Sequence, residues 1–195
     1  MIPLHRFRFF LRLSRSYFRM GAMGLALRWK GILGGFFIEP DFRSSQIRNI
    51  SIGPGTVIQR RAVFSMKPGS ILSIGKGTRI GSDAVIAVQE KVEIGEHVLI
   101  AARCFIADHN HEFRDDSRPI MRQKTTVPSP VSIGDGCWLG INVCILAGVN
   151  LGRNCVVGAN SVVTKSFPDF SILVGIPARS ITRAQAKKDP PIAEK

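Results

Sequence analysis

Between about Ile47 and Phe167, the apolar residues of the chain recur with a period of six. An aliphatic residue leads each hexad and is usually followed by Gly or another small residue, and a further small residue stands four places after the leading one. An amphipathic helix would need apolar spacing near 3.6 residues, so the pattern favours short strands instead. The longest unbroken run has its leading residues at Ile133, Leu139, Ile145, Leu151, Val157 and Val163.

This six-residue repeat predicts a triangular coil. Three sides form one turn, and each leading side chain points inward and stacks on its counterpart in the next turn. The small residue fits near a corner, where a larger side chain would collide with the adjacent coil, and Gly provides backbone freedom at the bends. Stacked parallel strands satisfy one another's backbone groups, and several coils share one core. The expected fold is therefore mainly β, a single-stranded parallel β-helix.

The repeat is interrupted twice. A small insertion around Met66 to Ser73 is expected to form a minor loop or bulge. A larger excursion, residues 107–132, is rich in charge, His and Pro. Long excursions from a regular scaffold are usually functional or mobile. The chain thus divides into an N-terminal segment (1–46), the β-helix with its active-site loop (47–168) and a C-terminal extension (169–195).

The flanking segments have a different character. No acidic residue occurs from Met1 to Gly35, and Arg8, Arg12, Arg15 and Arg19 fall at helical spacing on one face. We expect a basic amphipathic helix, which either rests on an anionic membrane surface or packs its aromatic side on the neighbouring domain. Both alternatives stay open. After Pro168, we expect residues 179–188 to form a short helix, followed by a polar tail.

Charge and cysteine content narrow the function classes. The formal net charge is +13, from 27 Lys and Arg against 14 Asp and Glu, which attracts nucleic acid, anionic lipid or phosphorylated ligands. No nucleic-acid recognition motif occurs, so we expect no nucleic-acid partner. Neither an export signal nor a membrane-spanning stretch is recognisable, so the expected location is the cytoplasm, with peripheral contact to the inner membrane face. Three of the four cysteines, Cys104, Cys137 and Cys155, occupy the small-residue position and indicate core packing.

Five ordered motifs point to a family. They are Ala107–Phe113, Ile133–Gly140, Ile145–Val149, Val157–Lys165 and Val174–Arg179. Over roughly residues 50–183 the chain resembles the hexapeptide-repeat acetyltransferases, in particular the galactoside, maltose and polysaccharide O-acetyltransferase branch. This resemblance implies a left-handed β-helix, a homotrimer, acetyl-CoA as co-substrate and no metal. It also implies acetyl transfer to a hydroxyl of a sugar or lipid-linked glycan, in capsule, O-antigen or exopolysaccharide biosynthesis.

The resemblance assigns the general base to His109, at the entrance of the long loop. An alcohol is a weak nucleophile at neutral pH, so an imidazole must take its proton during attack on the thioester, and histidine titrates in the required range. Asp108 and Glu112 are either orienting groups for an imidazole or ordinary loop charges. His111 either orients the acceptor or faces solvent.

Other site residues follow from the same resemblance. Trp138 is expected near the thioester, with a buried structural role as its alternative, and Ser82 stands where relatives carry an acceptor-binding Asn. The donor acetyl-CoA is expected in a groove between subunits, where basic side chains suit its phosphates. The residues expected to bind it are Gly140, Ile141, Ala159, Thr164, Lys165 and Arg179.

Two alternatives to the transferase are carried forward. A γ-class carbonic anhydrase shares this coil and would hold zinc with His97, His109 and His111, which must converge within about 2.1 Å of one ion. A non-catalytic β-helix scaffold is the other. The sequence does not decide which hydroxyl is acylated, nor whether the donor is acetyl or a longer acyl group.

Overall fold

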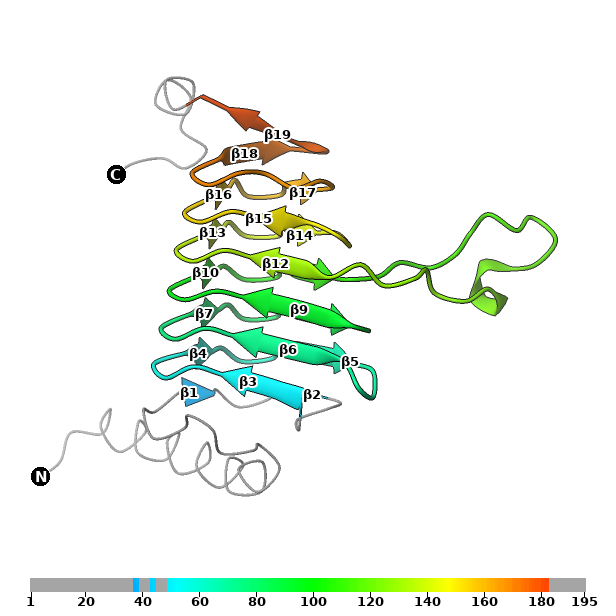
Figure 1. Ribbon diagram of the computed structural model, residues 1–195, viewed down its shortest axis with the longest axis horizontal. Helices are drawn as coiled ribbons and strands as arrows, with labels where there is room; N and C mark the ends of the chain where they lie inside the picture. The colour runs from blue at the N-terminus through cyan, green and yellow to red at the C-terminus, as the bar shows by residue number, and fades with distance from the viewer. Residues whose placement is uncertain (1–36, 39–42, 45–48, 183–195) are drawn as a thin grey trace, which may run out of the picture.

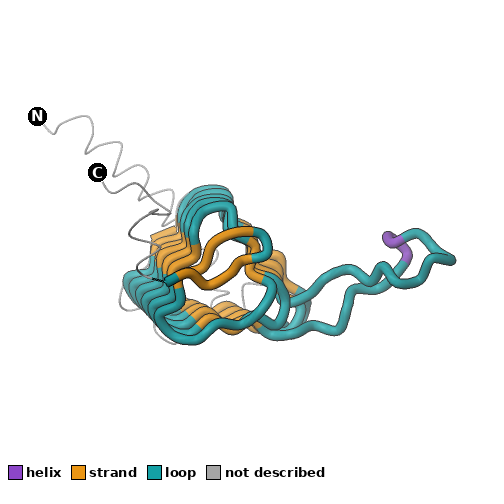
Figure 2. The backbone as a smooth tube through the Cα atoms, turned by 90° about the horizontal axis from the view of Figure 1, so that it is seen from above, coloured by secondary structure: helices purple, strands orange, loops and turns teal. Residues whose placement is uncertain are grey.

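The computed structural model describes residues 37–38, 43–44 and 49–182, which wind into a stack of triangular coils (Figures 1 and 2). The predicted parallel β-helix is confirmed, and the hexapeptide repeat fits its left-handed form. Apart from four residues in two short strands, the N-terminal segment and its expected helix lie outside the described residues.

Three sheets form the sides of the triangle, and the chain visits them in the order C, A, B in each coil. Every neighbouring pair is parallel except β18 with β19. Sheet A holds β1 (Phe37–Ile38), β4 (Val57–Ile58), β7 (Arg79–Ile80), β10 (Leu99–Ile100), β13 (Trp138–Leu139), β16 (Val156–Val157), β18 (Ile172–Gly175) and β19 (Ala178–Ile181). Sheet B holds β2 (Arg43–Ser44), β5 (Val63–Met66), β8 (Val85–Val88), β11 (Phe105–Ala107), β14 (Cys144–Ile145) and β17 (Val162–Val163). Sheet C holds β3 (Ile50–Ile52), β6 (Ile71–Ile74), β9 (Lys91–Ile94), β12 (Val131–Ile133) and β15 (Asn150–Leu151).

The leading aliphatic residues form the core, as the repeat predicts. Those of sheet A are at most 1% exposed and stack in register, coil upon coil: Ile58, Ile80, Ile100, Leu139, Val157 and Leu173. The small-residue position is also buried, at Cys104, Cys137 and Cys155. Burial raises the pKa of the Cys104 thiol to about 11 and that of Cys137 to about 12. These thiols are therefore protonated near neutral pH and act as packing groups.

Glycine is required where coils approach most closely. At the corner between sheets C and A (the C–A corner), a Cβ added to Gly75 would lie 2.5 Å from the carbonyl carbon and oxygen of Gly95 in the next coil. The corner between sheets A and B (the A–B corner) has a non-glycine residue with a left-handed backbone in every described coil. The residues there are Arg61, Asp83, Arg103, Asn142 and Asn160, with φ between 58° and 60°.

All irregularity is concentrated at the third corner, between sheets B and C (the B–C corner). Within the described core, consecutive inward residues are six apart at the other two corners. At the B–C corner the separation is ten from Phe64 to Ile74, eight from Ile86 to Ile94, 27 from Ile106 to Ile133 and six from Ile145 to Leu151. The predicted insertion near residues 66–73 is thus confirmed as a turn between β5 and β6, and the long excursion projects away from the coil between β11 and β12 (Figures 1 and 2).

The predicted C-terminal helix is wrong for its first residues, 179–181. We expected a helix over 179–188, but Ala178–Ile181 form the antiparallel strand β19 on β18. The free edge of sheet A pairs with the returning chain, and this pairing overrides the local helical preference. Residues 183–188 lie outside the described part. Among the described residues, the single helical element is a 3-10 turn, Ile120–Arg122, and no helix is long and apolar enough to cross a membrane.

Candidate active site

Asp108, the first residue after β11, has a fully buried side chain at the B–C corner. Its carboxylate accepts hydrogen bonds from three successive backbone N–H groups in the turn of the preceding coil. Oδ2 lies 2.7 Å from the nitrogen of Glu90 and 2.9 Å from that of Lys91, and Oδ1 lies 2.9 Å from that of Gln89. A buried carboxylate is tolerated only when it is satisfied in this way.

The same carboxylate orients His109. Its Oδ1 lies 2.8 Å from Nδ1 of His109, whose side chain is 18% exposed. Because an ionised carboxylate only accepts hydrogen bonds, Nδ1 carries the proton, and Nε2 of the neutral ring is left as a proton acceptor. The His109 ring is therefore held in one orientation at the B–C corner, just beyond the end of β11.

The excursion is an ordered arm, defined here as residues 108–130. Its two strands pair through an antiparallel bridge between His111 and Thr125, and the Ser129 nitrogen donates to the Asp108 carbonyl over 2.7 Å. Gln89 ties the arm to the coil, since its Oε1 accepts from Thr125 Oγ1 at 3.0 Å and from Lys67 Nζ at 2.7 Å. The arm is thus anchored to two earlier B–C turns.

The candidate acceptor residues are not gathered around His109 within one chain. His111 is exposed and lies two residues further along the arm. Ser82 lies at the A–B corner, where its nitrogen donates to Gln59 Oε1 over 3.1 Å. Trp138 is half-buried on the outer face of sheet A, between Leu99 and Val156. The width of sheet B separates both Ser82 and Trp138 from His109.

The candidate donor residues fall into three places. Thr164 and Lys165 follow β17 at the B–C corner, two coils beyond Asp108, or roughly 10 Å along the stack. Gly140, Ile141 and Ala159 lie at the A–B corner, where a Cβ on Gly140 would meet the Ala159 nitrogen at 2.7 Å. Close packing therefore already requires this glycine. Arg179 is on β19, where its Nη1 donates to the Ala178 carbonyl over 3.2 Å.

The outer faces of the sheets differ in polarity. The outward column of sheet B beside the A–B corner is apolar: Val63, Val85, Phe105, Cys144 and Val162. Closer to the B–C corner, the exposed Ser65 lies beside Ala87. The outward column of sheet A is apolar except at one rung: Val57, Arg79, Leu99, Trp138, Val156 and Ile172. The column of sheet C is polar: Ser51, Ser73, Glu93, Ser132 and Asn150.

Comparison with known proteins agrees with this geometry. A family model described as the hexapeptide repeat of succinyl-transferase matches residues 71–106 and 130–165, on either side of the arm. The galactoside O-acetyltransferase of Escherichia coli is 30% identical over 145 residues, which are 73% of this chain and 69% of that protein. The chain belongs to the hexapeptide-repeat acetyltransferases.

Other members of this acetyltransferase family are also similar. A Mycobacterium tuberculosis protein assigned as an acetyltransferase is 36% identical over 72% of this chain and 46% of its own length. An Escherichia coli protein assigned as a lipopolysaccharide biosynthesis O-acetyl transferase, WbbJ, is 40% identical over 57% of this chain. The chain spans 46% and 63% of the length of these two relatives. The crystal structure of a Vibrio cholerae hexapeptide-repeat acetyltransferase with acetyl-CoA is 31% identical, with a TM-score of 0.55 over 66% of this chain and 70% of that one.

Three histidines of the chain, His97, His109 and His111, are the alternative zinc ligands that the sequence offers. His97 lies at the C–A corner with a left-handed backbone, at φ 54°, whereas His109 and His111 lie at the B–C corner and on the arm. Over the residues that the structure describes, no three His, Cys, Asp or Glu side chains form a group able to hold a metal ion.

The role of Asp108 was left open by the sequence, yet one signal for it was present. In β11 the alternation places Ile106 inward, so Asp108 also falls in the inward phase. A carboxylate in an inward position must either accept hydrogen bonds or be protonated. This requirement applies to Asp108 but not to Glu112, whose side chain is 34% exposed on the arm. No comparable signal identifies Gln89 and Lys67, because their contact with Thr125 joins segments far apart in the sequence.

Proposed function

We propose that this chain transfers an acetyl group from acetyl-CoA to a hydroxyl of a sugar, with His109 as the general base. The observation that carries the proposal is the 2.8 Å contact that fixes the His109 imidazole on the buried Asp108 carboxylate. The O-acetyltransferase names of two relatives and the acetyl-CoA in a related crystal structure support the reaction and the donor. The relative named for lipopolysaccharide biosynthesis supports an acceptor from capsule, O-antigen or exopolysaccharide assembly.

The reaction needs one proton acceptor and no covalent enzyme intermediate. The acceptor hydroxyl attacks the thioester carbonyl carbon while Nε2 of His109 takes its proton, which makes the oxygen a competent nucleophile. The new carbon–oxygen bond forms, the carbon–sulfur bond breaks, and the sulfur of coenzyme A leaves and recovers a proton. Cys104 and Cys137 do not compete as nucleophiles, because burial raises the pKa of both thiols and keeps them protonated.

A homotrimer would complete this site. The apolar outer columns of sheets A and B meet at the A–B corner, so a three-fold axis near that corner would pack sheet A of one copy against sheet B of the next. Rotation about an axis parallel to the stack preserves height, which would bring Leu99 and Trp138 of a neighbour opposite β11. The pantetheine arm of the donor would then run along the B–C corner from His109 towards Lys165. Sedimentation should show three chains per particle, and Leu99→Asp should yield monomers; a native monomer contradicts this assembly.

The acceptor is a lipid-linked sugar or polysaccharide precursor at the inner face of the membrane. The sequence supports this through the basic N-terminal segment, with four arginines at helical spacing. Anionic vesicles should retain the full chain, and acylation of free sugars alone, with no vesicle binding, would exclude this acceptor class.

The decisive experiment follows acceptor-dependent thiol release from acetyl-CoA with a panel of free and lipid-linked sugars. His109→Ala should lower the rate roughly a hundredfold or more, because the alcohol loses its base. The matched control is His97→Asn, since Asn154 occupies the same C–A corner with a left-handed backbone. The control should stay near the native rate. An unchanged rate in His109→Ala would disprove the proposed base.

A further inference from the structure

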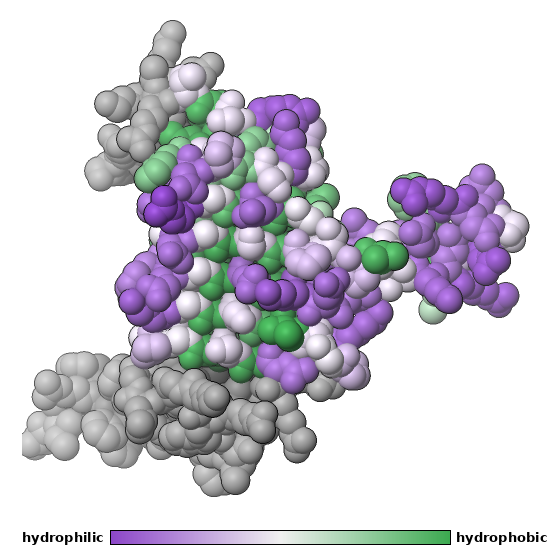
Figure 3. Space-filling view, viewed as in Figure 1, coloured by the Kyte–Doolittle hydropathy of each residue, from purple (hydrophilic) through white to green (hydrophobic). Residues whose placement is uncertain are grey.

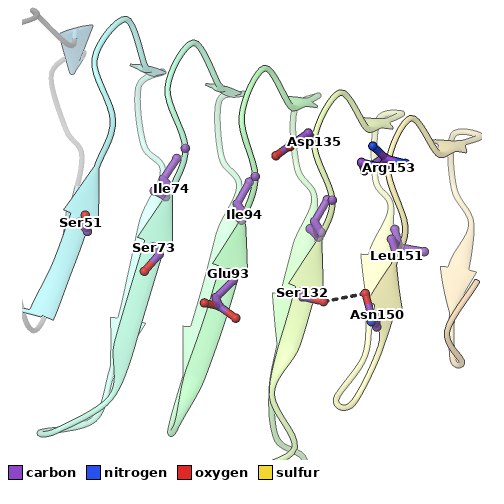
Figure 4. Close-up of a pocket in the computed structure, with 14 residues that line it drawn as sticks. Ser51, Ser73, Ile74, Glu93, Ile94, Ser132, Asp135, Asn150, Leu151 and Arg153 are labelled. Atoms are coloured by element: carbon purple, nitrogen blue, oxygen red, sulfur yellow. Dashed lines mark hydrogen bonds between the residues drawn. The ribbon is translucent and has the colours of Figure 1, made fainter. Parts of the chain in front are cut away.

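The outer face of sheet C carries a groove of about 480 Å³ that the proposed reaction does not use. The groove runs across five strands, β3, β6, β9, β12 and β15, and Figure 4 shows its side chains in a column along the stack. Sheet C faces the viewer in Figure 3, where polar residues run along it. The polar side chains that define the groove are Ser51, Ser73, Glu93, Ser132, Asn150 and Arg153.

The chemistry of this groove differs from that of the other two faces. Sheets A and B present apolar columns, which gain free energy when another protein surface covers them. A column of hydroxyl, carboxylate and amide groups gains little from such burial and instead matches a ligand with many hydroxyls. The groups are ordered, since Ser132 Oγ donates to Asn150 Oδ1 over 2.7 Å (Figure 4). This directs the amide NH₂ of Asn150 away from Ser132.

The groove is lined by two carboxylates, Glu93 and Asp135, and one guanidinium, Arg153. Glu93 pairs with Lys91 at 3.0 Å, and Arg153 pairs with Asp169 at 2.9 Å. An anionic polymer such as nucleic acid would need a net positive surface, which these pairs do not supply. A neutral, polyhydroxylated ligand suits them better. Neighbouring rungs are roughly 4.8 Å apart, about the length of one sugar ring, and the four steps from Ser51 to Asn150 span roughly 19 Å.

Strand β9 links the groove to the candidate active site, although the groove itself extends from Glu93 towards the C–A corner. The Asp108 carboxylate that holds His109 accepts from the nitrogen of Lys91, the first residue of β9, at 2.9 Å. Glu93 lies two residues further along this strand, or roughly 7 Å away. A chain molecule that extends from the groove past Glu93 to the start of β9 would therefore reach the B–C corner at which His109 sits.

We infer that the outer face of sheet C binds the remote part of a neutral oligosaccharide or polysaccharide acceptor while one of its sugars reacts at His109. This inference rests on the proposed function and narrows its acceptor from a lipid-linked sugar or polysaccharide precursor in general to a neutral glycan of several residues. The groove recognises sugar hydroxyls, and the arm and corner hold the sugar that is acetylated.

The test uses the full chain and an array of neutral oligosaccharides of one to six residues, with anionic glycans alongside. Ser73→Tyr fills the middle of the groove with a residue that strands favour, and Glu93→Gln removes one acceptor charge with little change in shape. Each should weaken retention of neutral glycans of three or more residues at least tenfold. Ser180→Tyr, the same change on the exposed strand β19, should not.

The outcomes separate the two proposals. Absence of retention of every neutral glycan, retention of anionic glycans alone, or retention unchanged in both groove variants would overturn the sheet C inference. Thioester cleavage that survives His109→Ala would instead overturn the proposed base, whatever the array shows. With any glycan that is turned over, Ser73→Tyr should raise KM tenfold or more and leave kcat near native, whereas a general loss of folding would lower kcat as well.

Discussion

The C–A and A–B corners repeat the same geometry in each described coil, whereas the B–C corner differs in almost every one. Six residues separate inward side chains at the first two corners, and six to 27 separate them at the third. The turn that holds Asp108, the arm and His109 all lie at this variable corner. A rigid stack on two corners therefore leaves the third free to carry chemistry, and three physical consequences can be tested.

The largest effect is expected from glycine substitutions at the two kinds of corner. Gly75→Ala places a Cβ 2.5 Å from the Gly95 backbone, which cannot retreat without separating two coils, and should cost about 3 kcal/mol or more. Gly69→Ala at the B–C corner meets nothing within 4 Å and should cost only about 1 kcal/mol, for its left-handed φ of 88°. Urea unfolding of both variants measures the difference. Equal losses would show that the corners are equally constrained.

Asp108→Asn should weaken both the fold and the catalysis. An amide offers one acceptor oxygen in place of two, so its NH₂ group must face either the Glu90 and Lys91 N–H groups or the Gln89 N–H and the His109 ring. This contact between donors should cost about 2 kcal/mol. The altered contact with His109 Nδ1 should also lower kcat roughly tenfold or more and shift its pH profile, with little change in KM.

The matched control for Asp108 is Asp115→Asn, which alters an exposed carboxylate on the same arm. The carboxylate of Asp115 bonds only to its arm neighbours Ser117 and Arg118 among the contacts described, and these contacts lower its pKa. This variant should keep the native kcat and pH profile. A native profile in Asp108→Asn as well would reduce Asp108 to a structural role.

The smallest effect is expected in the pH dependence of stability, through the buried thiols Cys104 and Cys137 at the two regular corners. Burial raises the pKa of Cys104 to about 11 and of Cys137 to about 12, from 9.0. Above pH 9 the thiols of the unfolded chain lose their protons, while those of the folded chain keep them. The contribution of the two thiols to the free energy of unfolding is therefore complete below pH 9, and it is lost as pH rises through their pKa values in the folded chain. The loss should approach about 1.4 kcal/mol per pH unit for each thiol. Urea unfolding from pH 8 to 11 should show a shallower decline in Cys104→Ala/Cys137→Ala than in the native chain, and identical slopes would refute the coupling.

The sequence predicts the regular part of this molecule well, because the core repeats one physical requirement. Each leading residue such as Ile100 must be apolar to stack on its neighbours, and Cys137 must be small to fit a corner, so the repeat itself encodes burial. The position of the arm follows from the same logic, as a break in the pattern.

Contacts between distant segments could not be predicted in this way. The two-residue insertion between Ile86 and Ile94 is hidden because Val88 and Val92 keep the apolar alternation. The burial of Asp108 depends on a turn some 18 residues earlier, and strand β19 depends on a vacant sheet edge. The sequence also could not predict which candidate site residues lie near one another, since Trp138 and His109 lie on different faces of the chain.

The antiparallel strand β19 has a consequence for the size of the particle. In a parallel stack, the last rung offers the same N–H and C=O groups as every rung before it, so nothing in the repeat itself limits its length. Such an edge can template further strands from other molecules, as in cross-β fibres. On sheet A this edge is occupied by β19, which runs in the opposite direction and pairs Arg179 with Val174 and Ser180 with Leu173. The returning strand thus removes from sheet A the parallel edge to which a further coil of the same kind could add.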